Sequence, residues 1–230
     1  MKAIKEIYLP RVKFIRNLKG SNTPILVEYF GKKYVIKNNS TAKQNVYEHA
    51  ANMLYETFST PVPHSELKSF NGKLVLMNEY VDGIPLGNIT FLHTYTQKKL
   101  TDSLWLDISM ANWDVFGSDK EMSNVIVQHN QPYRVDNGGV FIFRAKGNIK
   151  PDYFKNSIVD IHRMIFHGNY GKMAGHMTIN DIRYQIASAY ADVSANDLQK
   201  ILLKKTLIEK DECILISEQM IKRMMLFLKN

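Results

Sequence analysis

The sequence predicts an α+β fold of two lobes, a small β-rich lobe over residues 1–83 and a larger, mostly helical lobe over residues 84–230. Before Pro151, short segments with alternating or continuous apolar residues dominate, which is typical of β-strands. After Pro151, apolar residues recur three and four positions apart, which predicts helices. The turn signal Asp82-Gly83 and the linker after it mark the expected boundary between the lobes.

The first lobe is expected to contain a β-hairpin followed by a helix. Segments 26–30 and 34–37 alternate as strands do, and the Gly-Lys-Lys between them suits a tight turn because glycine permits a positive φ. Residues 41–58 then place apolar side chains at helical spacing, and either Ser40 or Thr41 can serve as the N-cap.

Further strands and helices are expected along the rest of the chain. A turn at Asn71-Gly72 leads into the apolar strand LVLMNEYV, which runs to the lobe boundary. Residues 95–111 have a broad helical pattern, and the hairpin region 112–147 contains the short strands NVIVQ and PYRVD. Helices are expected after it over residues 152–166, 178–190, 195–208 and 214–229.

Charged side chains lie on these elements in an order that suits phosphoryl transfer. Lys37 ends the strand YVIK, and Glu48 lies in the first half of the next helix, where it can turn toward that lysine. Glu56 is a rival on the same helix, but it lies in the second half. In phosphoryl transfer a strand lysine holds the nucleotide phosphates and a helix glutamate orients that lysine. We therefore assign these roles to Lys37 and Glu48.

The segment ANWDVFGSDKEMSNVIV carries two more candidates. Asp114 follows an apolar helical segment and Asn124 opens a strand. Phosphoryl transfer uses one aspartate to position the hydroxyl and an asparagine to hold the metal. Asp119 is a rival carboxylate, but its surroundings GSDKE are typical of an exposed turn. Asn112 is an alternative that orients the loop.

Asp136 is the last candidate, because an apolar strand delivers it to the Asn-Gly-Gly turn of YRVDNGG. This layout is similar to the metal aspartate and glycine of the kinase DFG motif. A plain hairpin turn explains the same letters, but the position after Asp114 and Asn124 favours a metal ligand. The prediction carries a geometric condition: Asp114 must meet Asn124 and Asp136 across the turn at residues 117–123.

Taken together, these motifs resemble a bacterial and phage family of divergent kinase-like proteins. The likeness spans roughly residues 17–150 and includes YVIKN, YEHAANMLYETF, EYVDGIPL, ANWDVFG and RVDNGG. The chain is more distantly similar to the HipA-like serine/threonine kinases, in which Asn-x-Asp precedes a metal asparagine and a later metal aspartate. Asn112-Trp113-Asp114 matches the first of these motifs. The resemblance implies a two-lobed protein-kinase-like fold, with ATP and Mg²⁺ as cofactors.

The resemblance also implies roles for five residues. Lys37 would bind the ATP phosphates, and Glu48 would pair with it. Asp114 would be the catalytic aspartate, while Asn124 and Asp136 would hold magnesium. The five side chains together would form a phosphotransferase site.

Further nucleotide contacts are implied for the turn Gly20-Ser21-Asn22, which would cover the phosphates, and for Glu79 and Tyr80 at the end of a strand. Two departures from the kinase pattern surround Asp114. The asparagine follows it by ten positions instead of five, and Trp113 stands where kinases have an arginine.

Composition excludes several other classes of protein. The formal net charge of +8 is compatible with an anionic partner, and residues 1–20 hold six basic residues and one acidic residue. We assign no role to this basic segment.

No apolar stretch approaches the roughly 20 residues of a membrane span, and no secretory apolar stretch occurs, so we expect no membrane contact and a cytoplasmic location. Cys213 is the single cysteine and the histidines are scattered, which argues against a disulfide or a zinc site.

The sequence therefore predicts an ATP- and Mg²⁺-dependent phosphotransferase that binds a nucleotide and acts on a protein hydroxyl. The alternative is a catalytically inactive pseudokinase or a regulatory protein that binds an acidic partner or nucleic acid through its basic end. Nucleotidyl transfer, in place of phosphoryl transfer, remains open as a variant of the phosphotransferase hypothesis.

Overall fold

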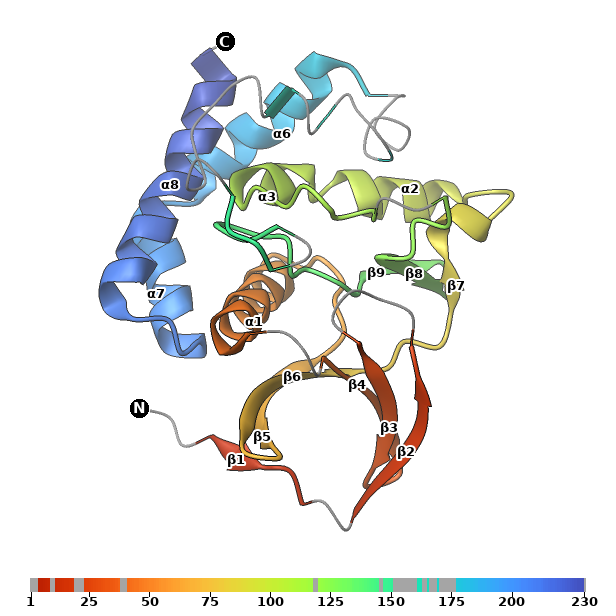
Figure 1. Ribbon diagram of the computed structural model, residues 1–230. Helices are drawn as coiled ribbons and strands as arrows, with labels where there is room; N and C mark the ends of the chain where they lie inside the picture. Colours follow the sequence, from red (N-terminus) through yellow and green to blue (C-terminus); the bar gives the residue numbers. More distant parts are fainter. Residues whose placement is uncertain are drawn as a thin grey trace.

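The fold combines a curved sheet, formed by the first third of the chain, with a group of helices formed by the last third (Figure 1). The computed structural model describes residues 4–8, 11–18, 23–37, 41–117, 120–144, 147–150, 161–162, 165, 169 and 177–229. The helix expected over residues 152–166 lies almost wholly outside these residues.

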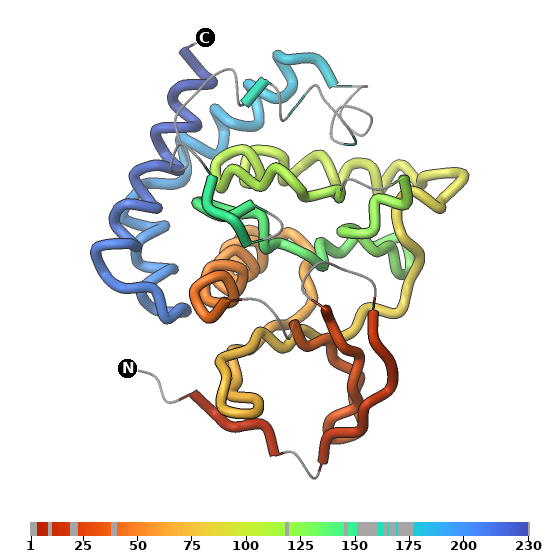
Figure 2. Tube along the Cα trace, in the orientation of Figure 1, coloured from red at the N-terminus to blue at the C-terminus, as the bar shows by residue number. Residues whose placement is uncertain are grey.

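The amino-terminal sheet has the strand order β1-β5-β6-β4-β3-β2, and its strands curl strongly (Figure 2). Neighbouring strands are antiparallel, except that β1 is parallel to β5. The strands are β1 (Lys5–Glu6), β2 (Val12–Asn17), β3 (Ile25–Tyr29), β4 (Lys32–Ile36), β5 (Ser65–Phe70) and β6 (Lys73–Glu79). The sheet buries an apolar cluster formed by Ile7, Val27, Ile36, Val75 and Met77.

The predicted hairpin is the pair β3 and β4, although Lys32 and Lys33, which were expected in the turn, belong to β4. Tyr29 pairs with Lys32, so Phe30 and Gly31 form a two-residue turn, and both have positive φ, at 50° and 77°. A turn of this hand matches the twist of the strands, and a glycine tolerates it without strain. The hairpin delivers Lys37 directly after β4.

The predicted helix is α1 (Ala42–Thr57), and it begins at the second of the two N-cap candidates. The hydroxyl of Thr41 accepts a hydrogen bond from the backbone N–H of Gln44 at 3.1 Å, which satisfies one of the free donors of the first turn. Helix α1 lies between the sheet and the carboxyl-terminal helices, and it contacts β5 and β6 on one side and α7 on the other (Figure 1). The helix that carries Glu48 is therefore held from two sides.

The chain leaves the sheet through β7 (Ile84–Pro85) and the short 3₁₀ helix η2 (Leu86–Asn88). Strand β7 joins a second, three-stranded sheet with β8 (Val125–Gln128) and β9 (Gln131–Arg134). The last two strands are the predicted pair NVIVQ and PYRVD, and Val125 pairs with Arg134.

The single helix expected over residues 95–111 is wrong in detail, because the structure has two helices there. They are α2 (Thr94–Thr101) and α3 (Leu104–Ser109). The Thr101 hydroxyl donates to the carbonyls of Gln97 and Lys98, at 3.2 and 3.0 Å, and so occupies acceptors at the end of α2. The break lets α3 turn its apolar side chains into the main core, where Leu104, Leu106 and Ile108 are fully buried.

The carboxyl-terminal helices are α6 (Ile179–Asp192), α7 (Ala195–Lys205) and α8 (Lys210–Lys229), close to the predicted ranges. Thr178 with Asp181, and Ser194 with Asp197, form reciprocal capping boxes that start α6 and α7. The apolar faces of these helices pack with α1 and α3 in one large core. Within the part of the chain that the structure describes, no helix is long and apolar enough to cross a membrane.

Candidate active site

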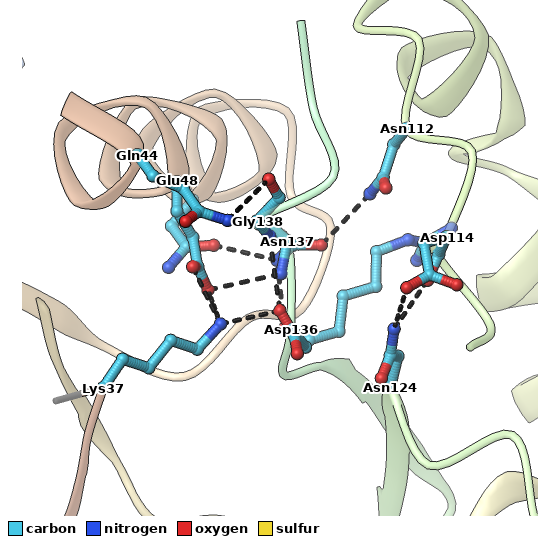
Figure 3. Close-up of polar contacts among 11 residues, drawn as sticks. Lys37, Gln44, Glu48, Asn112, Asp114, Asn124, Asp136, Asn137 and Gly138 are labelled. Atoms are coloured by element: carbon cyan, nitrogen blue, oxygen red, sulfur yellow. Dashed lines mark hydrogen bonds and ion pairs between the residues drawn. The ribbon is translucent and has the colours of Figure 1, made fainter. Parts of the chain in front are cut away.

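Lys37 lies where the first sheet meets α1, and its side chain is buried although it is charged. Its ammonium donates to both carboxylate oxygens of Glu48, at 2.6 and 2.8 Å, and to Oδ1 of Asp136, at 2.6 Å (Figure 3). Only 6% of the Lys37 side chain is exposed. A buried charge of this kind is tolerated because it is paired and hydrogen-bonded.

Glu48 reaches this lysine from the inner face of α1, and only 1% of its side chain is exposed. Its Oε1 also accepts the backbone N–H of Asn137 at 3.3 Å. The rival Glu56, two turns further along the helix, is exposed. The structure therefore brings Glu48, and not Glu56, to Lys37.

Asp136 follows β9 and is the half-exposed member of the cluster, with 45% of its side chain accessible. Its Oδ1 accepts from Lys37 and from the backbone N–H of Gly138, at 3.3 Å. Gly138 has little room for a side chain, because a Cβ there would lie 3.2 Å from both Gln44 and Glu48. Among the described residues, none donates to Oδ2 of Asp136, so this oxygen remains available to a ligand.

The three charges shift one another's pKa. Burial disfavours the charged form of Lys37, but Asp136 and Glu48 outweigh it and raise the pKa of the ammonium. Burial would also raise the pKa of Asp136, yet the charge and hydrogen bond of Lys37 lower it overall. Burial raises the pKa of Glu48, because the charge of Lys37 offsets only part of the cost of removing the carboxylate from water. The cluster thus combines a stable cation with a carboxylate that stays ionised.

Asp114 and Asn124 lie together on the other side of Asp136 in Figure 3. The Asn124 amide donates through Nδ2 to the backbone carbonyl of Asp114 at 2.7 Å and to its carboxylate at 3.4 Å. The ten-residue separation is closed by a turn that includes Gly117, whose φ is +72°. Asp114 and Asn124 therefore meet, whereas their approach to Asp136, which the sequence-based condition also requires, stays a prediction.

Asn124 is well oriented to offer an oxygen to a cation. Since Nδ2 faces a carbonyl, Oδ1 must point the other way, and no described residue donates to it. Mg²⁺ prefers oxygen ligands and is commonly bound through one or two protein groups plus substrate phosphates. Oδ1 of Asn124 and Oδ2 of Asp136 fit this pattern, and the described residues contain no group of three or more His, Cys, Asp or Glu that could hold a metal ion without a substrate.

A buried hydrogen-bond network behind the cluster was missed by the sequence reasoning. Asn137 donates through Nδ2 to Asn52 of α1 at 2.8 Å and accepts at Oδ1 from Asn112 at 3.2 Å. Asn112 also donates to the Tyr55 hydroxyl at 2.9 Å. The residue after Asp136 is thus tied to α1 and to the Asp114 loop by polar contacts. The only signal in the sequence was that Asn137 is polar. The contacts of Asn112 agree with the alternative role given to it, which is to orient the loop that leads to Asp114.

The network ends in an ion pair that the sequence did not predict. Arg134 on β9 donates to both oxygens of Asp107 on α3, at 3.2 and 2.8 Å, and both side chains are fully buried. The Tyr55 hydroxyl donates to the same carboxylate at 2.5 Å. Burial raises the pKa of Asp107, and Arg134 offsets this in part. This pair fixes β9, and with it the approach to Asp136.

The nucleotide contacts of Glu79 and Tyr80 stay a prediction. Their backbone N–H groups donate to the carbonyls of His64 and Lys33, so these two donors are not available to a nucleotide base. The next N–H, that of Val81, makes no hydrogen bond to a described residue. The turn Gly20-Ser21-Asn22 and the rival Asp119 lie outside the described residues.

Comparison with known proteins supports the fold. No protein-family model and no curated protein sequence matches the chain. Among solved structures, it is similar to the crystal structure of a proinflammatory kinase, CtkA, from Helicobacter pylori, with a TM-score of 0.62 and 13% sequence identity. The match covers 95% of both chains. The chain therefore has a kinase-like fold, and the predicted α+β arrangement of a β-rich sheet and a helical part is confirmed.

Proposed function

We propose that the chain is an ATP- and Mg²⁺-dependent phosphotransferase that acts on a protein hydroxyl. The observation that carries the proposal is the buried contact of Lys37 with Glu48 and Asp136, in a chain with a kinase-like fold. Phosphoryl transfer depends on positioning and on electrostatic stabilisation, and a lysine oriented by a helix glutamate is one of its recurring parts. The likeness to the Helicobacter pylori kinase agrees with this reaction class but supplies no substrate.

In this proposal Lys37 binds phosphate oxygens, and Glu48 holds the ammonium in place from α1. Glu48 and Asp136 already accept the three N–H donors of Lys37, so a phosphate oxygen would take the place of one of these contacts, and the lysine would not need to be drawn from solvent. A cation that is already in place lowers the barrier because it needs little movement during the reaction. Bound magnesium would supply neutralisation of the phosphate charge, with Asn124 and Asp136 as its protein ligands.

Asp114 would orient the acceptor hydroxyl and accept its proton. The Asn124 amide fixes the backbone and the carboxylate of Asp114, which gives the hydroxyl a defined position. The neighbouring Trp113 is 42% exposed, so its ring would be accessible to an acceptor. The N–H of Val81, which has no partner among the described residues, would be a candidate donor to the nucleotide base.

A thermal-shift measurement tests nucleotide binding directly. We expect Mg²⁺ with ATP, at about 100 times the dissociation constant, to raise the melting temperature by roughly 5–10 °C, because ligands that bind only the folded state stabilise it. The rise should require Mg²⁺ and should disappear in Lys37→Ala. The exposed Lys73→Ala is the matched control and should keep it.

The same experiment decides between the enzyme and its alternative. A melting temperature that does not respond to Mg²⁺ and ATP would contradict the proposal. Salt-sensitive binding of nucleic acid in the same protein would then favour a regulatory role for the basic amino-terminal segment.

A further inference from the structure

Lys150 carries a second buried ammonium. Its residue is 2% exposed, and its Nζ donates to three backbone carbonyls: Ala111 at 2.7 Å, Phe141 at 2.8 Å and Gly139 at 2.9 Å. An ammonium has three N–H donors, so these carbonyls match its full donor capacity. The ring of Trp113 lies 5.1 Å from the same nitrogen, within the range of a cation–π contact.

The three carbonyls belong to the two loops that carry the candidate site. Ala111 directly precedes the Asn112 to Asp114 segment, whereas Gly139 and Phe141 follow Asp136. The loops also share one direct backbone contact, from the N–H of Phe141 to the carbonyl of Met110 at 2.7 Å. Lys150 therefore joins the loop of Asp114 to the loop of Asp136 at a point close to both.

Two of the three acceptor residues have strained backbones. Ala111 and Phe141 have φ values of 52° and 51°, in the left-handed region that residues with a side chain rarely adopt. Such conformations persist only where the surroundings hold them. An ammonium bound to the carbonyls of both residues supplies such a restraint, because relaxing either loop would remove an acceptor from a buried charge.

We propose that Lys150 is a positioning residue of the phosphotransferase site, an inference that rests on the proposed function. It holds the Asp114 loop and the Asp136 loop at a fixed separation. Because Asn124 is bound to Asp114, this separation would keep Asn124 within reach of a metal bound by Asp136. Arginine cannot replace it, because a planar guanidinium cannot point its donors at three converging carbonyls as an ammonium does.

The test compares Lys150→Met with Lys210→Met, a matched change at an exposed lysine. Amide hydrogen exchange is followed over residues 110–117 and 136–143, and the Mg²⁺ concentration that gives half of the ATP-induced thermal shift is measured. We expect Lys150→Met to speed exchange in both segments together, while the middle of α1 is unchanged. The Mg²⁺ requirement should rise by about tenfold or more, as for residues that orient metal ligands. Lys210→Met should match the wild type in both measurements.

Exchange that is unchanged in either segment, or an unaltered Mg²⁺ requirement, would overturn the proposal. A uniform rise in exchange across the chain would also overturn it, since it indicates a general loss of stability. If the wild type shows no response to Mg²⁺ and ATP, the proposed function fails, and the exchange data alone decide whether Lys150 joins the loops.

Should Lys150→Met fail to fold, the wild-type protein provides the measurement. The Lys150 ammonium signal in the ¹⁵N spectrum, distinguished from that of Lys37 with Lys37→Met, should move when Mg²⁺ and an ATP analogue are added. A signal that stays in place would show that Lys150 does not sense the metal site, and would overturn the proposal.

Discussion

Replacing Asp136 by alanine is expected to lower phosphoryl transfer by about 10³-fold or more, because the variant would lose a proposed ligand of the metal that would stabilise transition-state charge. The change also removes one of the two carboxylates that hold the Lys37 ammonium, at 2.6 Å. Glu48 keeps its contact with Lys37, so the fold should survive. Transfer from labelled ATP to a hydroxyl-rich protein acceptor, together with ADP release, measures the effect.

Two further variants make this result interpretable. Asp136→Asn keeps an oxygen at the same place but loses the charge, and it should fall between alanine and the wild type. Asp192→Ala removes an exposed carboxylate at the end of α6 and should leave turnover unchanged. Turnover in Asp136→Ala equal to that of Asp192→Ala would remove Asp136 from the site.

The second large effect is on stability, and it concerns the buried pair of Arg134 and Asp107. Arg134→Met should lower the free energy of unfolding by about 3–5 kcal/mol, because it takes the cationic partner from a carboxylate with no exposed surface. The Tyr55 hydroxyl is then the remaining donor to Asp107 among the described residues. Chemical denaturation at neutral pH measures the loss.

A surface ion pair with the same nitrogen–oxygen distance provides the control. Lys98 and Asp102 are also 2.8 Å apart, but 73% and 42% of their side chains are exposed. Lys98→Met should therefore cost at most about 1 kcal/mol. Adding Asp107→Leu to Arg134→Met removes the buried carboxylate and should recover part of the loss. An Arg134→Met variant as stable as Lys98→Met would show that the pair does not hold β9.

Local sequence patterns were sufficient to predict the hairpin and the helix that carry Lys37 and Glu48. The alternating segments around Gly31 predict the hairpin, and helical spacing predicts α1, since both signals lie within a few residues. The break between α2 and α3 was not predicted, because apolar spacing continues across it.

The site itself was predictable only in part. The order of Lys37 and Glu48 along the chain indicated that these two charges belong together, and the structure places them in contact, with Asp136 as a further partner of the lysine. The support behind them was not predictable. Lys150 reads as an ordinary lysine, and its role depends on three carbonyls that only the folded backbone brings together.

The central claim is that Asn124 and Asp136 hold one metal ion against the phosphates of a nucleotide bound by Lys37. A crystal structure with Mg²⁺ and a non-hydrolysable ATP analogue tests it most directly. We expect one Mg²⁺ with Oδ1 of Asn124 and an oxygen of Asp136 as ligands at about 2.0–2.1 Å. Lys37 should contact a phosphate oxygen. A metal bound elsewhere, or an Asn124 that stays outside its coordination shell, would contradict the account.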